Sequence, residues 1–171
     1  GFSKFTSPMF GGFDGFDATE KDPLRNSKIA SSPTEVNDTI FYSLKKAIDV
    51  TSDADFLEYD LAVMPGITNT SLNTQLINAC EERADSLAIV DLEGGYVPPH
   101  ENTLAETANV GDVETTVIKL KDLNINSSYG AAFYPWVKIR DTAANSMLYV
   151  PPSVVALGTF SSAQRKSAVW F

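Results

Sequence analysis

The side chains best suited to catalysis are the single histidine and the single cysteine. His100, beside Glu101, could act as a base, and Cys80 could act as a nucleophile. Serine and cysteine hydrolases need a nucleophile, a base and an orienting carboxylate in one pocket, and the sequence has no Gly-x-Ser-x-Gly elbow. Cys80 also falls on the apolar face of an expected helix, where a free cysteine usually serves as a small buried side chain. We therefore predict no catalytic residue.

Carboxylates near the start of the chain could gather around a cation such as calcium. They belong to a Gly- and Phe-rich stretch and comprise Asp14, Asp17, Glu20 and Asp22. The alternating Asp/Asn pattern of a calcium loop is absent. We instead expect Gly and Asp to form turns while the phenylalanines anchor residues 1–31 as an extended arm on a core.

A second acidic run could suggest paired catalytic carboxylates, and it comprises Asp49, Asp53, Asp55, Glu58 and Asp60. Its simpler interpretation is a turn rich in helix-capping residues, followed by a solvated edge. A zinc site needs three or four nitrogen and sulfur ligands, which one histidine and one cysteine cannot supply. We predict neither a metal site nor a cofactor.

The composition indicates a globular protein whose partners are other proteins. A chain of 171 residues that is 43% hydrophobic can bury one sizeable core or two small ones. Its formal net charge of −9 argues against direct binding of nucleic acid, which needs clustered Lys and Arg. A single cysteine excludes an internal disulfide and favours a reducing compartment. No apolar run reaches the ~20 residues that span a bilayer, so no direct membrane contact is expected.

A helix is predicted near the start of residues 32–171, the expected α/β domain. Ser32 supplies an N-cap, Pro33 suits the first helical position, and Glu35 completes a capping box. Helical spacing then places on one face Val36, Ile40, Phe41, Leu44, Ala47 and Ile48.

A β-α-β unit follows this helix. Residues 56–64 begin with alternation, become continuously apolar and predict a strand. Caps at residues 68–71 start a second helix, and residues 86–92 predict another strand. The helix face comprises Leu72, Leu76, Ala79, Cys80 and Arg83. Strands joined in this way should be parallel.

The loop at Pro65-Gly66 would lie at the carboxyl end of the first strand, where α/β proteins often bind ligands. A phosphate there would be held by backbone N–H groups and the helix dipole. The glycine-rich fingerprints of nucleotide sites are absent, and no Lys or Arg lies between Pro65 and Glu81. The sequence therefore disfavours a nucleotide site.

The second half of the chain predicts a helix, a long strand, a hairpin and a last helix. After a polar loop, residues 110–123 form the helix and residues 129–140 the long strand, with Pro135 at a bulge or edge. Residues 141–146 turn the chain so that residues 147–150 pair back. The expected class is α/β (α+β), a layered sandwich with a mixed sheet flanked by helices.

Certain residues in these elements are expected to specify the fold. Trp136 and Tyr134 should pack the long strand against a helix, with Trp136→Ala costing ~3 to 5 kcal/mol if the side chain is buried. Pro151 and Pro152 should fix the turn into the last helix, and Arg83 should pair with Asp85 or cap a helix end.

Three features recur together in the last third of the chain: an aromatic-Pro-Trp strand through Trp136, a turn led by Asp141, and a Val-Pro-Pro-Ser step ending at Ser153, with Trp170 downstream. This combination resembles the tail sheath proteins of contractile-tailed bacteriophages. Similar stretches cover most of the chain: Gly11 to Gly15, Asp22 to Asn26, Ala47 to Asp49, Met64 to Gly66, Cys80 to Asp85 and Leu87 to Asp91. The resemblance is weakest at residues 93–109.

The resemblance implies a structural subunit and no enzyme activity. Sheath subunits polymerise around a tail tube and slip irreversibly from an extended lattice into a shorter, wider one, which drives the tube through the host envelope. The energy lies in the difference between two packings, so no cofactor is implied. The implied partners are other sheath subunits, the tail tube protein, and the baseplate and tail terminator proteins. The implied location is the virion, after assembly in the host cytoplasm.

Sheath proteins also carry terminal strands that exchange between subunits and a later C-terminal domain, and neither is evident in this sequence. We therefore expect a piece of a longer subunit that lacks the polymerising domain and stays monomeric by itself.

Other functions stay open at this point. A sheath from a bacteriocin-like particle or a secretion system would give the same pattern, and neighbouring capsid genes would favour a phage. A flavodoxin-like or hydrolase-like α/β enzyme is motivated by the Pro65-Gly66 loop, and binding of a flavin or nucleotide would favour it. A surface-adhesion module is compatible with the Gly- and aromatic-rich start.

Overall fold

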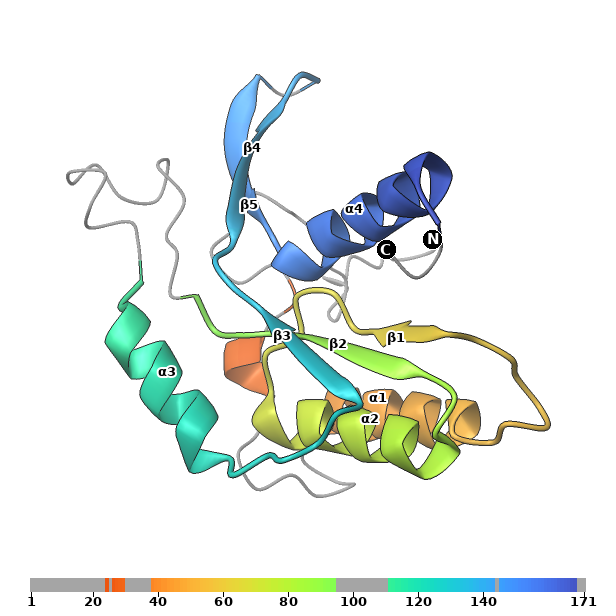
Figure 1. Cartoon of the computed structure of the whole chain (residues 1–171). Coiled ribbons are helices and arrows are strands. Elements are labelled where there is room, and N and C mark those ends of the chain that lie inside the picture. The colour runs from red at the N-terminus through yellow and green to blue at the C-terminus, as the bar shows by residue number, and fades with distance from the viewer. Residues whose placement is uncertain (1–23, 25, 30–37, 95–110, 144, 169–171) are drawn as a thin grey trace, which may run out of the picture.

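The structure, a computed structural model, describes residues 24, 26–29, 38–94, 111–143 and 145–168 (Figure 1). A short 3-10 helix comes first, at Asn26–Lys28. The remaining elements, in chain order, are α1 (Thr39–Thr51), β1 (Leu61–Val63), α2 (Thr70–Arg83), β2 (Leu87–Asp91), α3 (Val113–Asp122), β3 (Gly130–Phe133), β4 (Val137–Asp141), β5 (Ser146–Val150) and α4 (Pro152–Lys166). The α/β class, the β-α-β unit and the C-terminal hairpin are confirmed.

Parallel and antiparallel pairing occur in two separate sheets. β1, β2 and β3 form a parallel sheet in that order, with Ala62 opposite Ala88 and Ile89 opposite Ala131. β4 and β5 form an antiparallel hairpin that stands away from this sheet in Figure 1. Helices α1 and α2 cover one face of the parallel sheet, and α4 lies on the opposite side. Among the described helices, none is long and apolar enough to cross a membrane.

The core lies between the sheet and the α1–α2 layer. The predicted face of α2 is confirmed, because Leu72 and Cys80 are fully buried and Leu76 is 4% exposed. Asn69 is the N-cap, and its side chain accepts a hydrogen bond from the Leu72 N–H. The buried core comprises Ile29, Phe41, Ile48, Ile67, Leu72, Leu76, Ile77, Ala79, Cys80, Ala88 and Val90.

The start of α1 differs from the prediction. The expected cap at Ser32 lies outside the described residues, and α1 begins at Thr39 after a non-helical Asp38. The Asp38 carboxylate accepts a hydrogen bond from the Phe41 N–H, which supplies a cap of its own. Of the predicted apolar face, Phe41 and Ile48 are buried, whereas Ile40 in the first turn is 43% exposed.

The strand predicted at residues 56–64 is too long, since only Leu61–Val63 is a strand. The N–H groups of Phe56 and Leu57 donate to the Asp53 carbonyl at 3.3 and 3.2 Å. This turn follows α1 and leaves the Phe56 side chain 71% exposed.

The single strand predicted at residues 129–140 is wrong, because the structure has two strands in different sheets. β3 ends at Phe133 and β4 begins at Val137. Pro135 lies between them and follows a cis peptide bond. Proline has no N–H to donate to a ladder, so the chain leaves the parallel sheet at this point and enters the hairpin.

The helix predicted at residues 110–123 is confirmed as α3, but several of its apolar side chains are exposed. Val113, Val117 and Ile118 are 54%, 42% and 51% exposed, while the buried residue of this helix is Thr116. The Thr116 hydroxyl donates to the Glu93 carbonyl, which turns that side of the helix toward the end of β2.

Gly66 occupies a position that only glycine fits without strain. Its φ is +77°, and a Cβ would lie 2.6 Å from the Leu24 Cδ1 atom and 3.2 Å from the Pro151 Cγ atom. The β1–α2 loop therefore touches both the Leu24 segment and the start of α4.

Replacing Gly66 by Ala is expected to lower the free energy of unfolding by about 2 kcal/mol, because the backbone is strained and the methyl group collides. Gly158→Ala is the matched control, since a Cβ there meets nothing within 4 Å. This helical substitution should raise stability by about 0.5 to 1 kcal/mol. Urea denaturation of both variants measures the difference, and equal midpoints would contradict the account of Gly66.

Candidate functional site

A buried carboxylate lies at the carboxyl end of the central strand. Asp91, the last residue of β2, is 1% exposed. Its Oδ2 atom accepts hydrogen bonds from the Gly66 N–H at 2.9 Å and from the Ser153 hydroxyl at 2.7 Å. Its Oδ1 atom accepts from the Ser153 N–H at 2.9 Å. One side chain therefore joins the β1–α2 loop, β2 and the first turn of α4.

Hydrogen bonds and the position of α4 offset the free-energy cost of burying the Asp91 carboxylate. A buried carboxylate is costly unless hydrogen bonds replace its water, and donors to a charged oxygen form stronger bonds than donors to a neutral one. Ser153 also lies in the first turn of α4, where the helix dipole favours a negative charge. The predicted helix start at Pro151-Pro152 is confirmed, and it brings the Ser153 donors to Asp91.

The amide side chains of Asn26 and Asn73 also hold the β1–α2 loop and the end of β2 in place. Asn26 donates from Nδ2 to the Gly66 carbonyl at 2.8 Å and accepts from the Thr68 N–H at 3.0 Å. Asn73, in α2, donates to the Asp91 carbonyl at 3.3 Å. The β1–α2 loop is thus fixed on both sides, by the Asn26 segment and by α2.

These contacts determine whether the Pro65-Gly66 loop can bind an anion. An anion there would need free N–H groups, yet those of Gly66, Thr68 and Leu72 donate to Asp91, Asn26 and Asn69. The Asp91 carboxylate also places a negative charge beside the loop. The geometry therefore holds the chain together and opposes a phosphate at this position.

The surroundings of Ser153 likewise do not activate its hydroxyl as a nucleophile. Its hydroxyl donates to Asp91 and so is held by a carboxylate without an intervening base. His100 and the proposed calcium loop (Asp14, Asp17, Glu20 and Asp22) lie outside the described residues. Within the described part of the chain, no group of three or more His, Cys, Asp or Glu is placed to hold a metal ion.

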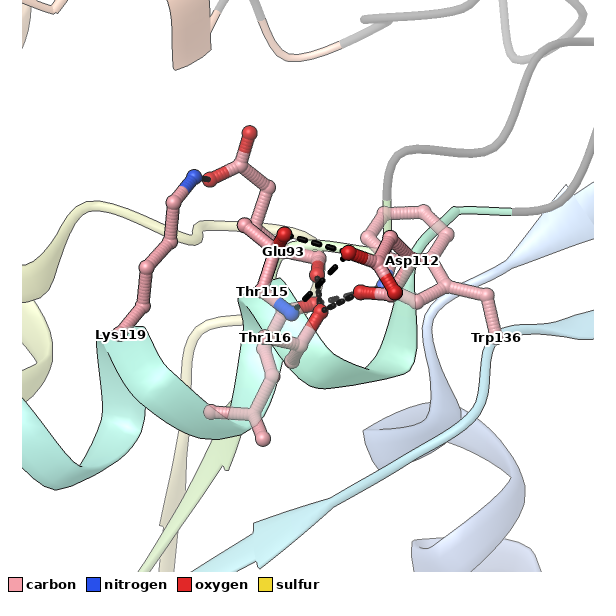
Figure 2. Close-up of polar contacts among 7 residues, drawn as sticks. Glu93, Asp112, Thr115, Thr116, Lys119 and Trp136 are labelled. Atoms are coloured by element: carbon pink, nitrogen blue, oxygen red, sulfur yellow. Dashed lines mark hydrogen bonds and ion pairs between the residues drawn. The ribbon is translucent and has the colours of Figure 1, made fainter.

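A second polar cluster fastens α3 and the β3–β4 link to the end of β2 (Figure 2). The Trp136 indole N–H donates to the Leu92 carbonyl at 2.9 Å. The Thr116 hydroxyl donates to the Glu93 carbonyl at 3.0 Å, and Lys119 pairs with the Glu93 carboxylate. The residues after β2 therefore contact α3 on one side and the hairpin link on the other.

The N-cap of α3 belongs to this cluster. The Asp112 carboxylate accepts hydrogen bonds from the Thr115 hydroxyl at 2.6 Å and from the N–H groups of Glu114 and Thr115. The Thr115 hydroxyl and then these backbone donors lower the pKa of Asp112 below its ordinary value. The cap is therefore ionised at neutral pH and anchors the start of the helix.

A cavity of about 230 Å³ lies between α2, α3 and the parallel sheet. Ile77, Val90 and Leu120 contribute to its apolar lining. Glu93 and Lys119 also line it, and because they pair with each other their charges are balanced. Asp91 also lines the cavity, and its carboxylate accepts from Gly66 and Ser153, so each charged group of the lining has a partner within the chain.

Other residues that the sequence singled out have structural roles. Arg83 pairs with Asp85 as predicted, through Nε and Nη2 at 2.9 Å, and also donates to the Thr51 carbonyl. Its guanidinium lies 4.2 Å from the centre of the Tyr59 ring. Cys80 is fully buried in the core, as predicted, and burial raises the pKa of its thiol.

The predicted role of Trp136 needs correction. It lies in the link between β3 and β4, outside any strand, and is half-buried, as is Tyr134. The condition of full burial behind the ~3 to 5 kcal/mol cost of Trp136→Ala is therefore not met. Asp91 was not predicted as a special residue, although a carboxylate that ends an otherwise apolar strand was a readable signal.

Comparisons with models of protein families, with curated proteins and with solved structures found no match for this chain. Any assignment of function therefore depends on the chain's own residues and contacts.

Replacing Asp91 by Asn is expected to lower the free energy of unfolding by about 3 kcal/mol, because the amide NH₂ replaces one carboxylate oxygen and leaves the buried N–H of Gly66 or Ser153 without its acceptor. The control is Asp122→Asn on α3, whose exposed carboxylate should tolerate the change within ~0.5 kcal/mol. Chemical denaturation compares the two, and a neutral Asp91→Asn would show that the carboxylate is not needed.

Proposed function

We propose that this chain is part of a contractile phage tail sheath subunit, which polymerises around the tail tube and contracts to drive the tube through the host envelope. The observation that carries the proposal is the connection from β3 to α4. Its aromatic-Pro-Trp and Val-Pro-Pro-Ser segments resemble sheath proteins. Trp136 is bonded to the Leu92 carbonyl and Ser153 to Asp91, so both segments attach to the end of β2.

A requirement of the sheath mechanism supports this interpretation. A subunit that slips between two lattice packings must keep its own fold, because the energy comes from changed contacts between subunits. The connection meets this requirement by tying α4 and the base of the hairpin to the parallel sheet. The residues behind the resemblance thus stabilise tertiary structure, as a mechanical part needs.

Apolar side chains are exposed on several faces of the chain, and this favours contacts with other proteins. They occur on the loop before β1, on α3 and on α4, and include Phe56, Val113, Ile118, Val154, Val155 and Phe160. Apolar surface of this kind marks contact sites when it is contiguous. A subunit in a helical lattice contacts several neighbours at once, so apolar groups on more than one face fit this role.

The proposal includes the partners and location of a sheath. The partners are other sheath subunits, the tail tube protein, and the baseplate and tail terminator proteins, with no cofactor and no catalytic step. The location is the virion, after assembly in the host cytoplasm. Residues 32–171 are proposed as one α/β domain of a longer subunit, and by itself the chain should be monomeric at micromolar concentration.

A sheath from a related injection machine, such as a bacteriocin-like particle or a secretion system, is the alternative within this class. Its distinguishing feature is genomic, because capsid genes beside the sheath gene favour a phage. A flavodoxin-like enzyme gains no support from the Pro65-Gly66 loop, since its N–H donors are bonded to Asp91 and Asn26.

The test is negative-stain electron microscopy of the longer subunit, expressed alone and with its tail tube protein. Hollow cogwheel-like tubes or sheathed tubes are the expected result, and the tube protein alone is the control, giving thin bare tubes. Monodisperse subunits under both conditions would contradict the proposal.

A further inference from the structure

The cavity of about 230 Å³ between α2, α3 and the parallel sheet has an apolar interior. Ile77 contributes to its wall from α2, Val90 from β2 and Leu120 from α3. Ile77 and Val90 are 4% and 5% exposed, so this part of the wall belongs to the buried core. Because all three side chains line the same cavity, they form one apolar surface that can surround a small molecule.

Helix α3 forms the outer wall of this cavity and is fastened by polar contacts. Its buried residue is the polar Thr116, whose hydroxyl donates to the Glu93 carbonyl. Leu120 and Leu123 of the same segment line the cavity, and α3 stands apart from α2 in Figure 1. Apolar atoms that border a cavity lack partners for dispersion contacts on that side. An occupant with an apolar body would supply those contacts.

One buried polar side chain of the lining has unused hydrogen-bonding capacity. Asn73, in α2, is 7% exposed and lines the cavity. Its Nδ2 atom donates to the Asp91 carbonyl at 3.3 Å, and its Oδ1 atom accepts no hydrogen bond from the residues that the structure describes. A buried acceptor without a donor costs free energy. An O–H or N–H group of an occupant would satisfy it.

The charged groups of the lining disfavour an ionic occupant. Glu93 and Lys119 pair with each other, and the Asp91 carboxylate accepts hydrogen bonds from Gly66 and Ser153. An ion that entered the cavity would lose its water without gaining a free counter-charge, which is costly. The occupant that fits is therefore uncharged.

We propose that this cavity binds a small uncharged molecule that has an apolar ring or short chain and one hydroxyl or N–H donor for the Asn73 Oδ1 atom. An apolar cavity of about 150 Å³ holds benzene, so about 230 Å³ accommodates two fused rings. The cavity also adjoins the end of β2 and the first turn of α2, a position where α/β proteins often bind ligands. This inference goes beyond the proposed function and does not depend on it.

Indole is the probe, because it joins a flat apolar ring system to one N–H donor. It is titrated into the isotope-labelled full chain while backbone and side-chain amide signals are recorded by NMR. Saturable shifts are expected at Ile77, Val90, Leu120 and Asn73, including the Asn73 side-chain amide, with a Kd of about 1 mM or below. Shifts that are scattered over the surface, or that do not saturate, would overturn the proposal.

Filling the cavity tests where indole binds. Ala132 lines the cavity from β3, so Ala132→Leu should weaken indole binding tenfold or more. Ala143→Leu is the matched control, because Ala143 is exposed in the turn between β4 and β5 and does not line the cavity. The control should leave the Kd unchanged, and a dispersed amide spectrum checks that each variant is folded. Equal Kd values for the two variants would contradict the site.

Two measurements on the unmodified chain do not depend on the folding of a variant. Nuclear Overhauser contacts are expected between indole and the methyl groups of Ile77, Val90 and Leu120, and contacts only to methyl groups outside the lining would rule the site out. Benzoate and benzylammonium, which are charged rings of similar size, should bind at least tenfold more weakly than indole. Binding of either ion as tight as that of indole would show that the proposed ligand class is wrong.

Discussion

The fold depends on one buried carboxylate whose two oxygens both accept hydrogen bonds in the interior. Asp91 is surrounded by donors from Gly66 and Ser153, which lie far from it and from each other in the sequence. Each charge-assisted hydrogen bond contributes about 1.5 to 3 kcal/mol, and removing the bonds would leave a buried charge that costs more. The β1–α2 loop, the end of β2 and the start of α4 must therefore be correctly placed together.

The hydrogen bonds to Asp91 hold the interior of the protein together, whereas other described segments lie on the surface without contact to Asp91. The parallel sheet, α2 and α4 are tied to one centre, whereas the α1–β1 loop and the β4–β5 hairpin lie away from it. A sheath subunit has the same division, because its interior must survive a lattice change while its surfaces exchange neighbours. The attachments at Trp136 and Ser153 fit a subunit that keeps its fold, and the exposed apolar groups fit a subunit with several neighbours. Both therefore support the proposed sheath function.

The sequence predicted the elements whose signals are local. A cap within residues 68–71, the apolar stripe of α2 and the Pro-Pro start of α4 were readable because capping and periodicity act within a few residues. The split at Pro135, the exposed turn at Phe56 and the exposed apolar side chains of α3 were missed, since they depend on which surface each segment meets. Asp91 was missed for a similar reason, because its donors are distant in sequence.

The most direct test of the central claim is native-state hydrogen exchange of the backbone amides that bind Asp91. If Asp91 unites the three elements, the N–H groups of Gly66 and Ser153 should exchange only through global unfolding, with the same free energy as the Ile89 N–H in the buried strand β2. Exchange of either amide through a low-energy local opening, while Ile89 stays protected, would contradict the account.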